Sequence, residues 1–463
     1  MKRSAVATQF YYLVGFLVAL LLASYAVFFN HYDALNSLQV AYATLIIMLG
    51  LLPGLVTLLN KREAGLIPLM PLHGIFYAVT FGLAALSNKT IWLADSEEEI
   101  TNALVFTIFG LICLYLGYYS FRRFFSRLTP IRTRNVPLKE QILAAWILFG
   151  MFLAFQFFPI LRSLTSVEQL SAPLGYLSLG ILALLAMDKR LRTLQLVFFV
   201  AALLFTLGIL TLSGSLAPTV LFLTFLGILY WNKKRRIPWH FIIAIALVTI
   251  ILNPVKSQYR DVVWRSGQSF SYYEKAHVFI DVVQEHYSGD DVFAKISEDT
   301  STVNRLAHIS TFGHVITLTP ENVPYWTGDS YRTLWTSFIP RALWPGKPKA
   351  TIGQDFGHRY GLIGQKDTWT SINLPWLVEF YANFGALGVF AGMFFVGMFF
   401  RVLVHKFRVP VSSPMEHVLG VTIMFGLFYA ESNFALMAGG IVSTYIAFIV
   451  LLRLLTSGRA VTA

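Results

Sequence analysis

Long apolar runs, each about 17 to 25 residues and almost free of charge, constrain this chain more than any other feature of its sequence. A hydrocarbon core about 30 Å thick needs about 20 such residues for one helix to cross it. Hydrophobic residues are 56% and charged residues only 13% of the 463 positions, which excludes a soluble domain. The runs predict an all-α polytopic membrane protein with twelve spans, at roughly 10–29, 37–59, 64–86, 103–121, 141–161, 172–187, 194–213, 217–231, 237–253, 375–400, 417–432 and 434–452.

Basic residues orient these predicted spans. Lys and Arg concentrate in alternate short connecting segments, for example Arg122, Arg123 and Arg127, so the positive-inside rule puts both termini in the cytoplasm and segment 254–374 on the outer side. That segment holds twelve Lys and Arg against twelve Asp and Glu. The net charge of +12 therefore reports topology and does not indicate a nucleic-acid partner.

The predicted organisation has three parts. Residues 1–253 carry spans one to nine, 254–374 form a large, mostly helical outer loop, and 375–463 carry the last three spans. The single cysteine, Cys113, lies in a span, so no disulfide can staple the loop. No set of His, Cys, Asp and Glu in the loop has a metal-ligand spacing, and we predict no metal and no cofactor. The acidic residues Glu97, Glu98 and Glu99 favour a solvated loop over a cation site.

Cations and a Trp open the outer loop. Lys256, Arg260 and Trp264 are spaced i, i+4 and i+8, so a helix would place them in one stripe. The stripe fits an interfacial anchor or, alternatively, a clamp for a lipid diphosphate. Ser271 and Glu274 predict a capping box at the start of a helix that ends near residue 288.

A second loop helix is predicted from about residue 302 to 318, with Arg305 and His308 near one face. His308 is the histidine we single out as a candidate general base. Further along, three prolines and a glycine stiffen the run Pro340-Arg341-Ala-Leu-Trp344-Pro-Gly-Lys347-Pro348, which would present two cations and a Trp from a rigid backbone. Arg359 is a further candidate contact for the substrate.

The tenth predicted span opens with two polar residues on one face. Glu379 and Asn383 are spaced i and i+4, and an unpaired carboxylate there would be costly. We read Glu379 as partner of an Arg from the outer loop or as a general base. Gly385, Gly388 and Gly392 form a ridge of small residues that predicts close helix packing. Tyr381, and Glu431 at the turn between spans eleven and twelve, are candidate binding residues.

Two of these motifs carry a family resemblance. The stretch Phe338-Ile-Pro-Arg-Ala-Leu-Trp-Pro-Gly-Lys-Pro348 and the opening Glu379-Phe-Tyr-Ala-Asn-Phe-Gly385, with a large outer loop late in a twelve-span chain, resemble the Wzy-type O-antigen and oligosaccharide repeat-unit polymerases. Members of that family often carry Arg after a Ser/Gly/Thr turn, where this chain has Leu216 after Ser213-Gly214-Ser215. The resemblance therefore shifts the expected diphosphate contacts to Arg260, Arg305 and Arg341.

The resemblance implies a glycosyltransferase in the bacterial cytoplasmic (inner) membrane with its large loop in the periplasm. It would move a growing glycan from undecaprenyl diphosphate onto a lipid-linked oligosaccharide repeat unit, without a nucleotide sugar. A chain-length regulator and a flippase are further candidate partners besides the bilayer. The expected catalytic residues are His308, Glu379 and Arg341, and the expected substrate-binding residues are Lys256, Arg260, Arg305, Trp344, Lys347, Arg359, Tyr381, Asn383 and Glu431.

Two alternatives stay open at this point. An O-antigen ligase would share the donor and the fold but use lipid A core as acceptor, whereas a lipid-linked oligosaccharide flippase or another transporter would usually place charges in the middle of the membrane. Spans one to nine contain no acid, and the two acids of the later spans, Glu379 and Glu431, lie near the outer side. This distribution favours an enzyme over a transporter.

Overall fold

The protein is described here from a computed structural model. The described residues are 35–59, 66–86, 97–129, 136–158, 171–234, 236, 238–264, 266, 268, 270–288, 307–337, 344, 346, 351–368, 370–407, 413–427 and 430–456.

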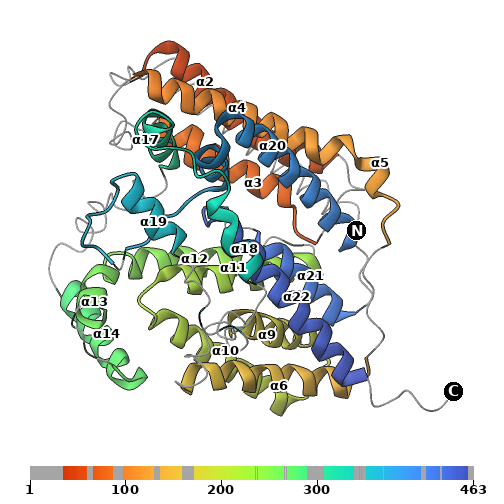
Figure 1. Ribbon diagram of the computed structural model, residues 1–463. Helices are drawn as coiled ribbons and strands as arrows, with labels where there is room; N and C mark the ends of the chain where they lie inside the picture. The colour runs from red at the N-terminus through yellow and green to blue at the C-terminus, as the bar shows by residue number, and fades with distance from the viewer. Residues whose placement is uncertain are drawn as a thin grey trace.

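Within these residues every element of secondary structure is a helix, in the order drawn in Figure 1. The elements are α2 (Ser37–Leu59), α3 (Leu69–Tyr77), the π-helix η2 (Ala78–Leu83), α4 (Glu97–Ser120), α5 (Arg122–Phe125), α6 (Leu138–Phe157), α9 (Ser171–Met187), α10 (Thr193–Thr211), α11 (Leu216–Lys234), α12 (Trp239–Leu252), α13 (Lys256–Val263), α14 (Tyr272–Tyr287), α17 (His308–Leu318), the 3₁₀-helix η3 (Asp329–Tyr331), α18 (Arg332–Ser337), α19 (Ile352–Arg359), α20 (Trp376–Lys406), α21 (Pro414–Gly426) and α22 (Phe434–Thr456).

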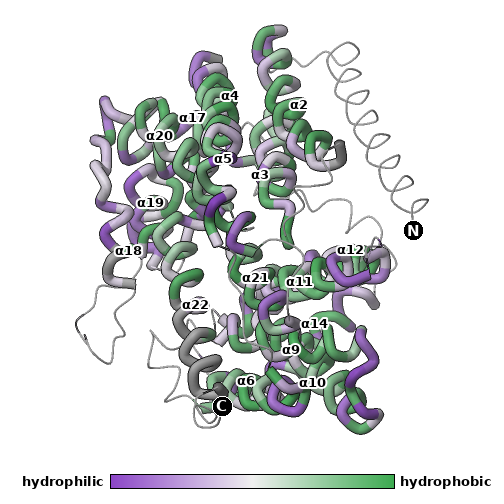
Figure 2. Tube along the Cα trace, turned by 90° about the vertical axis from the view of Figure 1, so that its right-hand side faces the viewer, coloured by the Kyte–Doolittle hydropathy of each residue, from purple (hydrophilic) through white to green (hydrophobic). Residues whose placement is uncertain are grey.

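Six of the described helices are long and apolar enough to cross a membrane: α2, α4, α6, α10, α11 and α20. Three shorter apolar stretches, in α3–η2, α9 and α12, accompany them. Figure 2 shows how the hydrophobic colour dominates these helices. Large apolar side chains also point outward, such as Leu387, 74% exposed, and Leu194, 66% exposed. A water-exposed surface of this kind is unusual, whereas a lipid-facing surface requires it. The chain is therefore a helical membrane protein, and the predicted span 10–29 lies outside the described residues.

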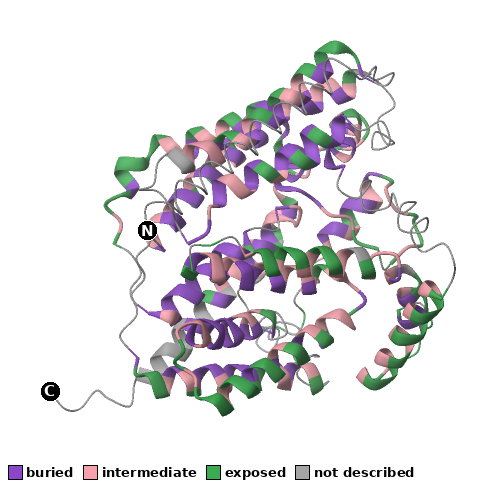
Figure 3. Ribbon diagram, turned by 180° about the vertical axis from the view of Figure 1, so that it is seen from behind, coloured by how far each residue is buried: buried purple, intermediate pink, exposed green. Residues whose placement is uncertain are grey.

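The helices form two groups, one above the other in Figures 1 and 3. One group holds α2, α3, α4, α17 and α20, and the other holds α6, α9, α10, α11, α12 and α21. Small residues let helices approach closely in the first group, because a Cβ on Gly117 of α4 would overlap the Phe394 carbonyl oxygen of α20. Such contacts between glycine-bearing helices supply the van der Waals packing on which membrane helices depend.

Helix α20 is broken, which corrects the single continuous span predicted for residues 375–400. Gly385 has φ 62° and ψ −146°, a conformation open essentially only to glycine. Beyond it the chain folds back on itself, because a Cβ on Gly388 would overlap the Phe380 carbonyl oxygen. The Trp376 ring likewise lies 6.2 Å from that of Phe400. The limb from Trp376 to Phe384 therefore packs beside the limb that ends at Lys406.

The predicted outer loop contains helices where the sequence indicated them. Ser271 caps α14 and forms the expected capping box with Glu274, and the helix ends at Tyr287. Two hydrogen bonds hold α14 across the ends of α6 and α12: Tyr272 donates to Gln156 Oε1 and Tyr287 donates to the Ile251 carbonyl oxygen. Much of α14 is exposed in Figure 3, whereas α17 is buried between α4 and the first limb of α20.

Candidate functional site

His308 and Glu431 meet where α17 faces the turn between α21 and α22. The Nε2 atom of His308 lies 3.2 Å from Oε2 of Glu431, although 123 positions separate the two residues in the sequence. The His308 side chain is 5% exposed and that of Glu431 20% exposed. The pair is thus largely enclosed, with Glu431 as its more accessible member.

The chemistry of the pair follows from what each group can do in a hydrogen bond. An ionised carboxylate only accepts, so neutral His308 must carry its proton on Nε2 and leave the Nδ1 lone pair able to take up another. Glu431 then orients the imidazole and stabilises the imidazolium once it forms, as an acid behind a histidine base does in many enzymes. This arrangement suits His308 to act as a general base.

An aromatic wall fixes the ring of His308 from behind. Its centroid lies 5.8 Å from that of Phe76 and 6.2 Å from that of Phe81. Phe81 belongs to the π-helix η2, which continues α3 directly. One extra residue per turn shifts the side chains that follow it, and such insertions are frequent at functional sites. The wall holds the imidazole plane while Glu431 sets its direction.

Glu379 is fully buried beside the start of α22, close to the turn that carries Glu431. Its Oε1 accepts a hydrogen bond of 2.7 Å from Ser330 Oγ, and its Oε2 accepts one of 2.7 Å from the backbone N–H of Phe434. The sequence suggests an Arg as its partner or a role as base. Among the described residues, the Ser330 hydroxyl and the Phe434 N–H bind the carboxylate, and the Glu379 side chain is fully buried.

Asn383 completes this network, as its spacing from Glu379 predicts. Its Nδ2 donates to Ser330 Oγ and to the Glu379 carbonyl oxygen, both at 2.8 Å, and its Oδ1 accepts from the Gly328 N–H at 2.9 Å. The break at Gly385 leaves helix carbonyls without helical partners, and the chain before η3 supplies them: the Trp326 N–H donates to the Ala382 carbonyl oxygen and the Thr327 N–H to that of Asn383.

Tyr331 lies beside this network. Burial, together with the nearby Glu379 carboxylate, raises the pKa of Tyr331 well above its usual range. Its ring lies 6.4 Å from that of Phe434. The tyrosine thus stays neutral and adds no charge beside Glu379.

Residues 69–462 match a family described as a domain of unknown function (DUF8712). The match covers well over half of the chain. The chain belongs to the DUF8712 family. No curated protein and no solved structure matches it. Every candidate site residue of this DUF8712 protein lies inside the matched region.

Two candidate cations, Lys256 and Arg260, lie on α13, elsewhere in the DUF8712 protein. The Nε of Arg260 donates to the Gly214 carbonyl oxygen at 2.6 Å, and its guanidinium lies 4.7 Å from the Trp264 ring centre. Lys256 donates to Asn253 Oδ1. Arg260 and Trp264 thus contact Gly214 in the turn between α10 and α11, whereas Lys256 bonds to the residue that follows α12. Figure 1 draws α13 and α14 apart from α17 and α20, so this cluster is not brought to the His308–Glu431 pair.

Of the other residues that the sequence suggests for the site, the structure describes Tyr381, Arg359 and Trp344. Tyr381 is buried and packs on Phe312 of α17, with ring centroids 5.7 Å apart. Arg359 donates to the Pro324 carbonyl oxygen and lies over the Trp326 ring at 5.6 Å, so it supports the segment that docks on α20. Trp344 is 39% exposed. The predicted cations Arg305, Arg341 and Lys347 lie outside the described residues.

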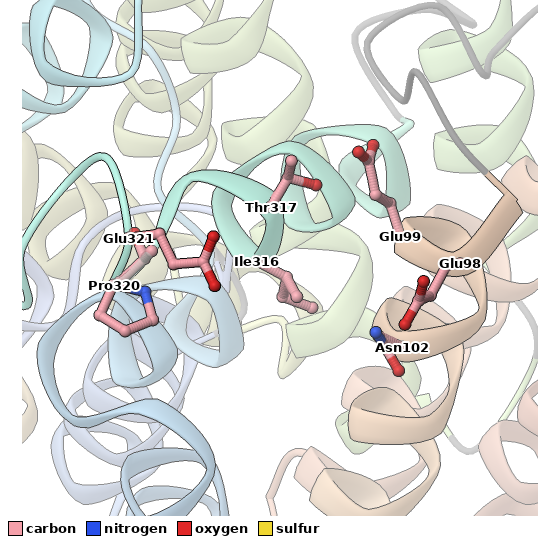
Figure 4. A pocket seen from close by; sticks show the side chains of 8 residues that line it. Glu98, Glu99, Asn102, Ile316, Thr317, Pro320 and Glu321 are labelled. Atoms are coloured by element: carbon pink, nitrogen blue, oxygen red, sulfur yellow. The ribbon is translucent and has the colours of Figure 1, made fainter.

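A cavity of about 420 Å³ opens at the far end of α17 (Figure 4). Glu98, Glu99 and Asn102 line it from α4, and Thr317 and Glu321 line it from α17 and the chain beyond. Glu98 and Glu99, which the sequence assigns to a solvated loop, lie in the first turn of α4 and line this cavity. Across the described part of the chain, no three His, Cys, Asp or Glu side chains are grouped to hold a metal ion.

The sequence does not predict two members of the site. Ser330 and Gly328 belong to the run Gly-Asp-Ser-Tyr-Arg, which predicts a turn leading into a short amphipathic helix and nothing about the partners of that turn. The structure shows that this turn docks on the first limb of α20 through Asn383 and Glu379. A serine in a glycine-containing turn is a common pattern, and so is a helix with Glu and Asn at i and i+4. Neither pattern indicates that this turn and this helix bind one another.

Proposed function

We propose that this protein is a membrane glycosyltransferase that polymerises lipid-linked oligosaccharide repeat units on the outer side of the bacterial cytoplasmic membrane. The His308–Glu431 pair carries the proposal, because it joins a histidine able to take a proton to a carboxylate that orients it. The resemblance of the Pro-Arg-Ala-Leu-Trp-Pro-Gly-Lys-Pro loop and of the start of α20 to Wzy-type polymerases supports the choice of substrate.

The proposed reaction is a displacement at an anomeric carbon. The hydroxyl oxygen of the acceptor sugar forms a bond to that carbon, the bond from the carbon to the diphosphate oxygen breaks, and the lipid diphosphate leaves with the electron pair. The acceptor proton passes to Nδ1 of His308. A general base of this kind commonly contributes about 10²- to 10⁴-fold to the rate.

Cations are needed where charge develops on the leaving diphosphate. We assign this role to Arg305, Arg341 and Lys347, because guanidinium groups bind phosphate oxygens bidentately and these residues flank His308 and Trp344 in the sequence. Placed electrostatic groups of this kind commonly contribute about 3 kcal/mol each to the transition state. Trp344 would offer a platform for a sugar ring. Arg260 is left to anchor α13 against the α10–α11 turn, and Lys256 bonds to Asn253.

The topology we propose has twelve spans, cytoplasmic termini and the segment 254–374 in the periplasm. The distribution of Lys and Arg supports it. A lipid-linked donor and acceptor would then reach the pair from the bilayer, with both diphosphates at the membrane surface. Undecaprenyl diphosphate is the lipid that the resemblance implies.

The direct test is a reconstituted assay with purified protein in liposomes. A synthetic repeat unit on a short-chain lipid diphosphate is the substrate, and the products are resolved by size with and without EDTA. We expect a ladder of glycans that persists in EDTA. Glycan transferred only to added lipid A core would replace the proposal with a ligase. Substrate that crosses the bilayer unchanged would overturn the enzyme in favour of a transporter.

A transporter is the second candidate, because one observation favours it. The first limb of α20 ends at Gly385 within an apolar helix, and broken helices of this kind build the binding sites of many transporters. In this protein, however, the carbonyls of Ala382 and Asn383 freed by the break are occupied by Trp326 and Thr327. The break therefore serves the docking of the outer segment, which favours the enzyme.

A further inference from the structure

The turn that carries Glu431 is held at both ends by the first turn of α20. On one side the N–H of Trp376 donates to the Ala430 carbonyl oxygen at 3.4 Å, and on the other the N–H of Phe434 donates to Glu379 Oε2 at 2.7 Å. Glu431 lies between these two attachments. Asn433 additionally caps α22 by accepting from the Leu436 N–H. The position of Glu431 is thus set from α20 rather than by α21 or α22 alone.

The same short limb also sets the position of His308. Tyr381 follows Glu379 by two residues, about 200° around the helix, so the two side chains lie on nearly opposite faces. Tyr381 packs on Phe312, one turn along α17 from His308, whereas Glu379 holds the start of α22. The limb lies between the helix of the base and the turn of its carboxylate, and it contacts both.

The Glu379 carboxylate cannot swing away from this arrangement. Ser330 Oγ donates to its other oxygen, and Ser330 in turn accepts from Asn383 Nδ2. Three further hydrogen bonds tie Trp326, Thr327 and Gly328 to Ala382 and Asn383. The Glu379 residue is 0% exposed, so its two bonded oxygens serve the protein and do not touch a substrate.

We propose that Glu379 is a positioning residue, which fixes Glu431 opposite His308 and couples that pair to the docked outer segment at residues 326–331. The geometric part of this inference stands on the hydrogen bonds alone. Its meaning for catalysis rests on the proposed glycosyl transfer. A loosened Glu379 would let the α21–α22 turn move relative to α17, and the base would lose its orienting carboxylate.

A crosslinking experiment tests the geometry without any enzyme assay. The full-length protein carries Cys113→Ala, so that no native thiol remains, together with His308→Cys and Glu431→Cys. A bifunctional methanethiosulfonate with a two-carbon spacer then joins the two introduced cysteines. We expect Glu379→Ala to slow crosslinking about tenfold, because two buried hydrogen bonds are lost. One joins Glu379 to Ser330, and the other joins it to the Phe434 N–H at the start of α22. Glu379→Gln should stay within about threefold of the parent, since the amide oxygen can accept from Phe434 and its NH₂ can donate to Ser330.

Two controls separate positioning from general damage. A cysteine pair at Lys233 and Asp188, which form an ion pair of 2.7 Å between α11 and the end of α9, should crosslink at the same rate in all Glu379 variants. Labelling of single cysteines at 308 and 431 by a monofunctional reagent corrects for access. Equal crosslinking of 308 to 431 in Glu379→Ala and the parent would overturn the inference.

The kinetic readout then separates this inference from the proposed function. In the glycan assay Glu379→Ala should lower kcat with KM within about threefold, and Glu379→Gln should restore most of the rate. A Gln variant with intact crosslinking but no turnover would assign Glu379 a chemical role and refute positioning. If the parent protein has no transferase activity while the crosslinking result holds, the proposed function fails and the positioning inference stands.

Discussion

At the scale of single residues, the site depends on buried polar groups that are hydrogen-bonded to one another. The Asn383 side chain makes one accepted and two donated bonds, and those to Gly328 and Ser330 connect the 326–331 segment to α20. A buried donor that loses its acceptor costs more free energy than the bond contributes when formed, because water cannot replace the acceptor. Each member of the network therefore depends on the others.

The Asn383→Ala substitution should destabilise the protein measurably. The Gly328 N–H would lose its acceptor and Ser330 Oγ a donor, so we expect the free energy of unfolding to fall by about 1–3 kcal/mol. Equilibrium unfolding in mixed micelles measures it. Asn322→Ala, at an exposed position of the same segment, should change the value by less than about 0.5 kcal/mol. Equal effects of the two substitutions would show that the network contributes little.

The sequence predicted the residues of this network better than their partners. The i, i+4 spacing placed Glu379 and Asn383 on one face because helical geometry is local. Ser330 and Phe434 are 49 and 55 positions from Glu379, and no periodicity links such segments. His308 and Glu431 were likewise each singled out alone, since a contact across 123 positions depends on how the helices pack.

At the scale of elements, the break in α20 is the feature that creates the site. Had α20 run straight, the carbonyls of Ala382 and Asn383 would bond within the helix, and Trp326 and Thr327 would lose the backbone acceptors on which they dock. The glycines at 385, 388 and 392 have the spacing of a packing ridge, and the sequence alone suggested contact with another helix. In the structure Gly388 and Gly392 instead pack against Phe380, which belongs to the first limb of the same helix.

Substitution at the break should be far more damaging than a helical glycine substitution elsewhere. In Gly385→Ala the residue keeps φ 62°, and its Cβ would lie 2.7 Å from the Tyr325 hydroxyl oxygen, so we expect a loss of about 1–3 kcal/mol in the free energy of unfolding. Gly150→Ala is the matched control, because position 150 is helical and nothing lies within 4 Å of the place that its added Cβ would occupy. A change there should be small and stabilising, by about 0.5–1 kcal/mol. Equal losses would contradict the assigned role of the break.

At the scale of the whole molecule, two groups of helices meet at the site. The first limb of α20 belongs to one group, and the turn between α21 and α22 belongs to the other. The apolar runs predicted a helical membrane protein because the hydrocarbon core imposes its own length and composition on a span. They could not show which spans are broken or how groups of helices associate, since both depend on small residues and buried polar contacts between distant segments.

The most direct test of the proposed function is the turnover of a His308→Gln protein in the reconstituted glycan assay. Glutamine keeps much of the side-chain size but cannot take up the acceptor proton, so we expect kcat to fall by about 10²- to 10⁴-fold with KM within about threefold. His314→Gln is the control, because that ring bonds to the Tyr360 carbonyl oxygen and its loss should leave kcat nearly unchanged. A His308→Gln protein that builds glycan ladders at the parental rate would contradict the role of His308 as the general base.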